Sequence, residues 1–389
     1  MRKSSFARVA SVCAAALALT LAGATAASAE PNPLPTPGTP ASYRTYAAVG
    51  SDTIQDVWNG LSNGSGAVAP SVASWNAFPS TLSSTIQTKD GGAIFLRPRG
   101  SGAGVKALSA SVHTPFLYDN GAGSTVNVQG QVDFARSSSG PAATTVTNQL
   151  KYIPFARDAV SVAYRAASAA AATPTFTKAQ LNAIFSCTSS ADGVIGVSGG
   201  FPTIAASGQV LKPQLPQTSS GTRSFFISAI GLTTVGGCVV SGAAENDGSV
   251  LTATGDIIPF SAAQWIAQKN TSTTGVTNTV SNAALKIANF NNGTTTKTAV
   301  VVTSGVAGPG TLYGSATTVP NASTDPLARD TYNVVDASVI GTGTATGLEK
   351  VLTTDLSTTA AKATISKFGF LNLSYLGDRT LYRNGAYTN

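Results

Sequence analysis

Four short turns of similar composition constrain the fold of this chain more than any other feature. Each is rich in glycine, serine, threonine or arginine, and each follows an apolar stretch that favours a β-strand. Each also stands where a helix is expected to begin. The four turns are residues 50–53, 97–104, 136–141 and 217–222. This repeated order predicts an open α/β sheet, in which ligands bind beyond the carboxyl ends of the strands.

The turn at residues 217–222 has the composition of an anion-binding loop. Its small and charged side chains are Ser219, Ser220, Gly221, Thr222 and the following Arg223. Glycine permits close backbone approach, and the first N–H groups of a helix attract anions. The alternative is an ordinary capped surface helix. Recurrence of the pattern at three other places favours the anion-binding interpretation.

Residues 1–29 have the composition of a secretory signal peptide. Three basic residues open the segment, an apolar stretch covers 12–23, and an A-x-A motif stands at 27–29. We therefore expect cleavage after Ala29 and a secreted protein. Ala24 stands where a lipoprotein would carry its lipid-bearing cysteine, so we expect no membrane anchor.

Composition narrows the class of protein further. Removal of the three basic residues of the signal segment lowers the formal charge from +7 to +4, and the remaining basic residues are scattered. Nucleic-acid binding and membrane-surface binding are therefore not expected. With 42% hydrophobic and 11% charged residues the chain can bury a large core, and its length predicts two domains.

Two cysteines follow the signal segment, Cys187 and Cys238. In an oxidising compartment such a pair predicts a disulfide rather than a metal site. His113 is the only histidine in the chain, and no dinucleotide, Walker or zinc-protease motif is present. We therefore expect no catalytic set, no metal and no cofactor.

Proline and β-prone stretches indicate how the chain is organised. Residues 30–42 contain five prolines and predict an extended linker. Residues 152–164 form a long β-prone stretch, and residues 330–335 form a second one. Each is a candidate for a strand that crosses between two lobes.

The ordered set of motifs resembles the phosphate-type periplasmic solute-binding proteins of ABC importers, and most closely their secreted actinobacterial branch. The stretches that carry the resemblance are residues 50–53, 100–104, 132–138, 154–160 and 220–226. It spans about residues 43–376 and implies a two-lobe α/β clamp of type II with a two-strand hinge. The implied division is residues 43–155 plus 330–389 for lobe 1 and 156–329 for lobe 2. We expect a monomer.

The resemblance also implies which residues bind phosphate. The matching positions are Thr53, the backbone amide of Ile54, Ser101, Ser220, Gly221 and Thr222. Two positions depart from the family pattern. Ser138 stands where the family has a proton-accepting aspartate, and Pro216 stands where it has an arginine.

These departures require other residues to supply the two charges. We expect the guanidinium to come from Arg136 or, less favoured, Arg223, and the proton acceptor to be Asp52. The alternatives are a helix N-cap for Asp52 and a solvated first-turn residue for Arg223. A buried acceptor would favour phosphate over sulfate, because sulfate has no proton to donate.

The sequence therefore predicts a protein that captures inorganic phosphate, or a similar tetrahedral oxyanion, and catalyses no reaction on it. The resemblance implies an ABC permease as partner, although the missing lipid anchor makes delivery to it less certain than binding. Two alternatives from other classes stay open. One is an extracellular phosphatase-like enzyme on the same fold, and the other is a surface or adhesive protein that has lost the ligand.

Overall fold

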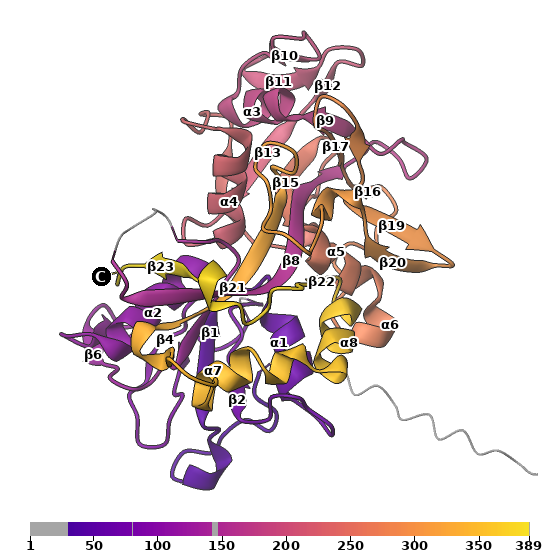
Figure 1. Cartoon of the computed structure of the whole chain (residues 1–389). Coiled ribbons are helices and arrows are strands. Elements are labelled where there is room, and N and C mark those ends of the chain that lie inside the picture. The colour runs from indigo at the N-terminus through magenta and orange to yellow at the C-terminus, as the bar shows by residue number, and fades with distance from the viewer. Residues whose placement is uncertain (1–29, 80, 142–146, 389) are drawn as a thin grey trace, which may run out of the picture.

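The computed structural model describes residues 30–79, 81–141 and 147–388, so the predicted signal peptide lies outside the described residues. Two α/β lobes are joined by the strands β8 (Leu150–Arg165) and β21 (Ala328–Asp336), which run between them in Figure 1. Both strands cover the stretches that the sequence proposed as crossings. The lobe boundaries expected at 155/156 and 329/330 fall inside or beside these strands and stay a prediction.

One large mixed sheet passes through both lobes in the order β14-β13-β15-β8-β21-β7-β1-β2. Lobe 1 contributes three parallel strands, β7 (Phe134–Ser137), β1 (Tyr46–Gly50) and β2 (Val72–Ser74). Lobe 2 contributes three more, β15 (Asp256–Ser261), β13 (Lys212–Pro216) and β14 (Val240–Ala243). The short strands that pair with β8 are β16 (Leu285–Ile287), β22 (Leu371–Asn372) and β23 (Arg383–Gly385).

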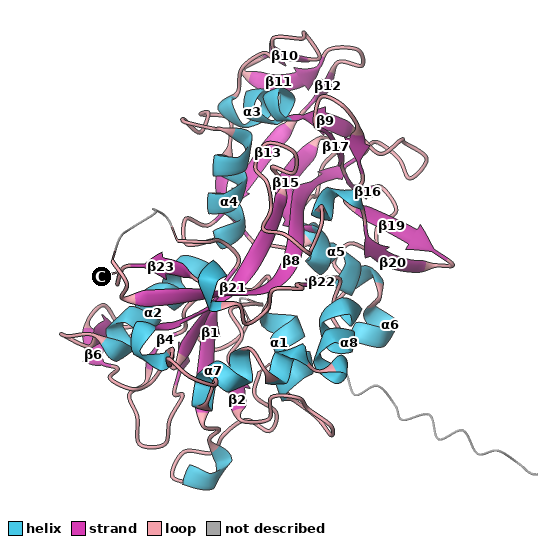
Figure 2. Cartoon of the chain, viewed as in Figure 1, coloured by secondary structure: helices cyan, strands magenta, loops and turns pink. Residues whose placement is uncertain are grey.

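Four helices flank this sheet in Figure 2. They are α1 (Gln55–Ser62), α2 (Ser101–Val112), α4 (Gly221–Ile230) and α5 (Ala262–Lys269). Three of them follow one of its strands, and α2 follows β4 (Phe95–Leu96) of a separate two-stranded sheet. The turn at 136–141 differs from the other three, because the described residues between β7 and β8 contain no helix. The remaining helices are α3 (Lys178–Ser186), α6 (Thr271–Thr274), α7 (Gly347–Leu352) and α8 (Thr359–Lys367).

Small sheets and 3₁₀ turns complete the described part of the chain. The two-stranded sheets pair β3 (Thr85–Ile86) with β4 (Phe95–Leu96), β5 (Leu117–Asp119) with β6 (Thr125–Asn127), and β19 (Val300–Thr303) with β20 (Val306–Pro309). One three-stranded sheet contains β10 (Ile195–Ser198), β11 (Phe201–Ile204) and β12 (Gln209–Val210). The other contains β9 (Thr175–Thr177), β17 (Asn289–Asn291) and β18 (Thr296–Lys297). The 3₁₀ turns are Pro40–Ser42, Gly248–Val250, Thr311–Tyr313, Ala337–Val339, Asp355–Ser357 and Arg379–Leu381.

The antiparallel pairing of β8 with β21 fixes the geometry of the hinge. Arg329 lies opposite Asp158, and Asp330 lies opposite Arg157. Opposite residues of two paired strands share a face of the sheet, whereas successive residues alternate between faces. The hinge therefore carries one arginine–aspartate pair on each face.

Local sequence explains where the key helices begin and end. The side-chain oxygen of Ser220 accepts the N–H of Arg223 and caps α4, and Gly231 ends that helix in the left-handed conformation. Ser261 caps α5 in the same way. Thr177 and Gln180 form a capping box at the start of α3.

The hydrophobic cores follow the two lobes. One core uses buried residues from 159 to 327 and fills lobe 2. Two others cover the two faces of the lobe 1 sheet, and Trp58 packs in one of them against Phe134 and Phe155, with ring centroids 5.0 and 5.7 Å apart. Two alanines of α5, Ala263 and Ala267, also join this lobe 1 core. Helix α5 therefore contributes to the contact between the lobes.

Residues 30–42 do not form a free linker. Glu30 is buried and makes an ion pair with Arg97, and the N–H of Gly38 donates to Asp90 at 2.8 Å. The segment therefore packs along lobe 1, and proline content alone did not predict these contacts. Within the described ranges, no helix has both the length and the hydropathy that crossing a bilayer requires.

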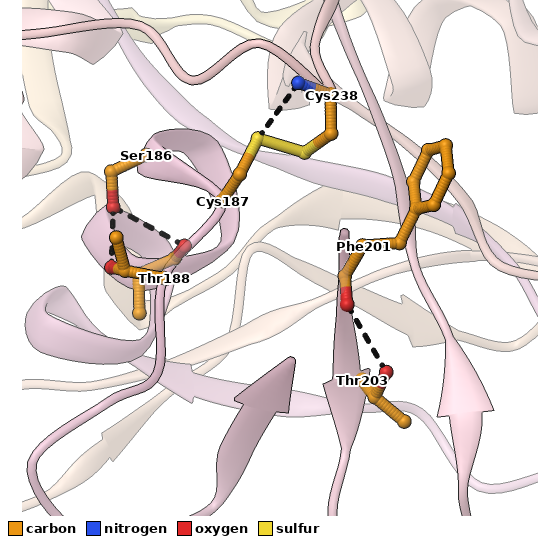
Figure 3. Close-up of a disulfide and its surroundings, with 7 residues drawn as sticks. Ser186, Cys187, Thr188, Phe201, Thr203 and Cys238 are labelled. Atoms are coloured by element: carbon orange, nitrogen blue, oxygen red, sulfur yellow. Dashed lines mark hydrogen bonds between the residues drawn. A yellow bond between two sulfur atoms is a disulfide. The ribbon is translucent and has the colours of Figure 1, made fainter. Parts of the chain in front are cut away.

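The predicted disulfide between Cys187 and Cys238 is confirmed (Figure 3). Cys187 follows α3 in the left-handed conformation, and Cys238 lies in the loop before β14, with the two Cα atoms 6.0 Å apart. The bond therefore joins two positions of lobe 2 that have a sequence separation of 51.

Removing this disulfide is expected to destabilise the protein without affecting the junction between the lobes. In the chain-entropy model a loop of this length contributes about 4 kcal/mol, so C187S/C238S should lower the free energy of unfolding by roughly that amount. Urea unfolding followed by circular dichroism measures the change. A loss below about 1 kcal/mol would show that the bond has little structural effect.

Candidate anion-binding site

The turns of lobe 1 and lobe 2 meet directly at the junction between the lobes. The N–H of Gly102 donates to the carbonyl of Ser219 at 3.0 Å, and the hydroxyl of Ser219 donates to the carbonyl of Arg99 at 2.8 Å. The hydroxyl oxygens of Thr53 and Thr222 lie 3.3 Å apart. The starts of α1, α2 and α4 therefore converge, and the lobes are closed on each other.

Three of the predicted contact residues form the tightest part of this junction. The N–H of Ser138 donates to the hydroxyl of Ser101 at 3.0 Å, and the two hydroxyl oxygens lie 3.2 Å apart. A Cβ atom on Gly221 would lie 2.5 Å from the hydroxyl oxygen of Ser138 and closer still to that of Ser101. Only glycine allows α4 to approach lobe 1 this closely.

Arg136 was expected to supply the guanidinium that binds the anion, but its side chain does not face the junction between the lobes. Its side chain is fully buried, and it donates to the carbonyls of Ser51, Ala48 and Trp75 and to the hydroxyl of Ser74. Burial lowers the pKa of Arg136 to about 10. The guanidinium thus fixes the backbone beneath the turn at 50–53, so its donors are not free for a ligand.

Arg223 also uses its donors within the protein. Its Nη1 donates to the carbonyl of Pro216, at the end of β13, at 2.8 Å and to the hydroxyl of Ser241, in β14, at 3.2 Å. The side chain is half-buried. It therefore ties the start of α4 to the neighbouring strands of lobe 2.

The arginine that faces the junction is Arg329, which the sequence analysis did not propose. It is 2% exposed, and its Nε and Nη2 donate to Oδ2 of Asp158 at 3.0 and 2.8 Å. Nη2 also donates to the hydroxyl of Thr222 at 2.9 Å. Nη1 has no hydrogen-bond partner among the described residues. An unpaired buried donor costs free energy of folding, so proteins rarely keep one. The unpaired Nη1 therefore indicates a site where a ligand can supply the hydrogen-bond acceptor.

Asp158 is held so that it supports Arg329. Its carboxylate accepts from the hydroxyl of Ser261 at 3.0 and 2.9 Å and from the N–H of Ala263 at 3.1 Å. It therefore occupies the start of α5, where a negative charge is favourable. This anchoring fixes the guanidinium of Arg329 in one orientation.

The arginine on the opposite face of the hinge provides an internal comparison. Arg157 donates to Asp330 at 2.9 Å, to the hydroxyl of Tyr375 at 2.9 Å, and to the carbonyls of Tyr313, Ser315 and Thr318. All of its nitrogens therefore have partners. Of the two hinge arginines, only Arg329 keeps a donor for something else.

Asp52 lies at the junction, but it is not a helix N-cap. Helix α1 has Ile54 as its N-cap residue and no side-chain cap, so the alternative interpretation of Asp52 is wrong. Instead, Oδ2 of Asp52 accepts from the Nδ2 of Asn246, in lobe 2, at 2.8 Å. Burial, and then the charge of Glu245, raise the pKa of Asp52 well above its ordinary range.

Further lobe 2 side chains hold the same turn. The hydroxyl of Thr53 donates to Oε1 of Glu245 at 3.3 Å. The Nε2 of Gln264 donates to the carbonyl of Thr53 at 2.8 Å and to Oδ2 of Asp56 at 3.2 Å. Burial raises the pKa of Asp56 to about 6. Within the described residues, no group of three or more histidine, cysteine, aspartate or glutamate side chains is arranged to hold a metal ion.

The sequence contained a signal for the missed hinge residues. Ala156-Arg157-Asp158 and Ala328-Arg329-Asp330 repeat the same tripeptide in the two candidate crossings. Two antiparallel copies of this tripeptide place the arginine of each strand opposite the aspartate of the other. Glu245 and Asn246 stand in the stretch 245–248, whose composition indicates a turn with a possible place at the rim of a ligand site, but no repeat of this kind marks them.

Fold and junction together define a two-lobe binding protein whose lobes close on a polar interface. A family model described as "PBP superfamily domain" matches residues 62–353. The chain therefore belongs to the PBP superfamily, the periplasmic binding proteins, which confirms the predicted family and fold class. The actinobacterial branch stays a prediction. None of the curated proteins matches the sequence significantly.

The solved structures to which this chain is similar include the following three. A human phosphate binding apolipoprotein is similar, with a TM-score of 0.50, 16% identity, and coverage of 86% of this chain and 92% of that chain. An ABC-type phosphate transport receptor from Vibrio cholerae has a TM-score of 0.47 and 15% identity, over 84% and 99% of the two chains. A putative phosphate ABC transporter substrate-binding protein from Clostridium perfringens has a TM-score of 0.47 and 12% identity, with coverage of 85% of this chain and 99% of that chain. At these identities the likeness concerns the fold alone.

Proposed function

We propose that this protein binds a tetrahedral oxyanion, with inorganic phosphate as the first candidate, between its two lobes and without chemistry. The observation that carries the proposal is the unpaired Nη1 of buried Arg329, beside the hydroxyls of Thr222 and Thr53. A guanidinium with a fixed orientation suits an oxyanion, because charge-assisted hydrogen bonds are short and strong. The similar human apolipoprotein is described as phosphate binding, so phosphate is the first ligand to test.

The ligand contacts follow from the groups around Arg329. The hydroxyls pair in the closed protein: Thr53 of lobe 1 with Thr222 of lobe 2, and Ser101 with Ser138 within lobe 1. When the lobes open, the bond between Thr53 and Thr222 breaks, and an oxyanion can then accept from these hydroxyls on closing. Ser220 caps α4, so Gly221 and Thr222 present the first amides of that helix, and Ile54 presents the corresponding amide of α1.

Arg136 and Arg223 act in this proposal as positioning residues. Arg136 holds the turn at 50–53 from beneath, and Arg223 holds the start of α4 against β13. Asp52 keeps its place as a proton acceptor for phosphate, since its carboxyl is buried beside Thr53. We also propose secretion after cleavage at Ala29, a monomeric state, and delivery of the anion to an ABC permease.

The phosphatase-like alternative has no support at this junction. Ser101 and Ser138 bond to each other, and no histidine is among the hydrogen-bond partners of either residue. His113 instead stacks on Tyr387, with ring centroids 4.5 Å apart, beside a surface pocket of lobe 1. We therefore propose no hydrolytic activity.

Calorimetric titration with phosphate, arsenate and sulfate tests the proposed function. Phosphate and arsenate are expected to bind with similar affinity, because both are tetrahedral and both carry a proton near neutral pH. Sulfate should bind more weakly, since it cannot donate to Asp52 and would face its charge when ionised. Absence of binding for all three anions would reject the proposal and favour the surface-protein alternative.

A further inference from the structure

Two buried carboxyl groups, one from each lobe, meet at the edge of the junction. Asp52 of lobe 1 is 4% exposed and Glu245 of lobe 2 is 3% exposed. One oxygen of each has a donor: Asn246 donates to Oδ2 of Asp52, and Thr53 donates to Oε1 of Glu245. The other two oxygens, Oδ1 of Asp52 and Oε2 of Glu245, have no partner among the described residues.

A single proton would satisfy both of these oxygens. The same two residues hold both carboxyl groups: Thr53 donates to Glu245 at 3.3 Å, and Asn246 donates to Asp52 at 2.8 Å and to the hydroxyl of Thr53 at 3.4 Å. The two carboxyl groups therefore lie side by side and line one pocket. Two ionised carboxylates in contact away from water repel each other strongly, and one of them must hold a proton. A protonated carboxyl donates to an ionised one, which leaves neither oxygen unpaired.

We propose that Asp52 and Glu245 share one proton across the junction, so that closure of the two lobes takes up a proton. When the lobes separate, water reaches both carboxyl groups, and the shared proton is no longer needed. The shared proton then acts as a pH-dependent latch, and Glu245 is the residue that makes closure depend on pH. The latch acts in the ligand-free closed protein; in the complex with an oxyanion, which rests on the proposed function, the proton of phosphate takes the place of the shared proton on Asp52.

The charged groups around Asp52 and Glu245 do not remove the need for a shared proton in the closed protein. Asp56 on α1 and Asp247 beside Glu245 line the same pocket of about 270 Å³ and add negative charge. Arg136 lies beneath Asp52 and is the nearby cation that favours its ionised form, but its N–H groups are taken by carbonyls and Ser74. Arg329 reaches the pair only through Thr222 and Thr53. Asn246 and Gln264 are neutral.

The sign of the pH dependence follows from the protons that each state binds. The pKa of Asp52 is raised in the closed protein, whereas in the open protein it should lie near the ordinary value of about 3.9. The closed state therefore binds more protons at any pH between those two values. The contribution of the proton to closure is fully present below the ordinary pKa of Asp52. Above it, the equilibrium constant for closure falls by up to about tenfold per pH unit until the pH passes the raised pKa.

Small-angle X-ray scattering of the ligand-free protein between pH 5 and pH 9 tests the latch. Without phosphate the ligand's own titration cannot contribute to the result. The wild-type radius of gyration is expected to increase with pH as the lobes open. In Glu245→Gln the amide donates to ionised Asp52 without a proton, so the radius should depend much less on pH.

Asp247→Asn is the matched control, because it removes one carboxylate from the same pocket. Its side chain accepts from the N–H of Ser249, a role that asparagine can also fill, so the wild-type pH profile should persist. A flat profile in the wild type, or equal profiles in wild type and Glu245→Gln, would overturn the proposal. A pH-dependent radius in a protein that binds no phosphate would support the latch and reject the proposed function alone.

Discussion

Arg329→Gln is expected to lose phosphate binding while Arg223→Gln keeps it. Arg329 supplies the unpaired buried donor at the junction, whereas Arg223 donates to groups of its own lobe. Loss of a buried charged partner costs about 2–5 kcal/mol of binding, which corresponds to roughly 30-fold to several-thousand-fold in affinity. Calorimetric titration of both variants with phosphate measures the difference.

A change in stability has to be separated from the change in binding. Without Arg329 the carboxylate of Asp158 keeps Ser261 and Ala263 but loses its cation, and breaking a buried ion pair costs about 3–5 kcal/mol. The double variant R329Q/D158N removes both charges and should recover part of that stability. It should still fail to bind phosphate. Wild-type affinity in the folded double variant would contradict the role given to Arg329.

Gly221→Ala is expected to weaken anion binding by preventing full closure. The added Cβ would meet the hydroxyls of Ser101 and Ser138 and would lie 2.9 Å from the Cβ of Ser101. Those atoms belong to the opposite lobe, so the methyl group acts as a wedge between the lobes. Overpacking costs about 1–3 kcal/mol, which predicts roughly a 5- to 150-fold loss of affinity.

The stability of each separate lobe should change little in Gly221→Ala. Gly221 occupies the first position of α4, where alanine is a better helix former than glycine. Gly237→Ala is a suitable control, because a Cβ there has no atom within 4 Å. Equal phosphate affinity in Gly221→Ala and the wild type would show that the anion is not held by closure at this contact.

The elements of the fold were largely predictable because hydrophobic periodicity and caps acted locally. The β-prone stretch at 152–164 lies within β8, and the periodic stretch after residue 53 forms α1. The helix expected after the turn at 217–222 is α4. Contacts made by residues 30–42 were missed, because they depend on the neighbouring surface of lobe 1 rather than on proline content.

The turns that meet at the site were predictable, but the charged residues within it were not. Small polar turns at the ends of strands identified Thr53, Ser101 and Gly221, which all reach the junction. Arg136 stands in such a turn, yet it lies on the strand β7 with its side chain among carbonyls of lobe 1. A side chain in the last residues of a strand can point to either side, and the sequence does not state which.

The choice of Arg329 required the register between β8 and β21, in which Arg329 lies opposite Asp158, 171 residues away in the chain. Arg157 and Arg329 stand in the same tripeptide, and both pair with an aspartate of the opposite strand. What distinguishes them is the layer that covers each face of the hinge. Carbonyls of the 313–318 loop take the donors of Arg157, whereas the junction leaves one donor of Arg329 free. No local pattern encodes that difference.

A crystal structure of the protein grown with phosphate would show directly whether an anion is held between the lobes. We expect one phosphate enclosed there, within hydrogen-bond distance of Nη1 of Arg329 and of the hydroxyls of Thr53 and Thr222. The bond now present between those two hydroxyls should be replaced by bonds to the ligand. Lobes that stay closed on each other without an anion, or a phosphate bound only elsewhere, would contradict it.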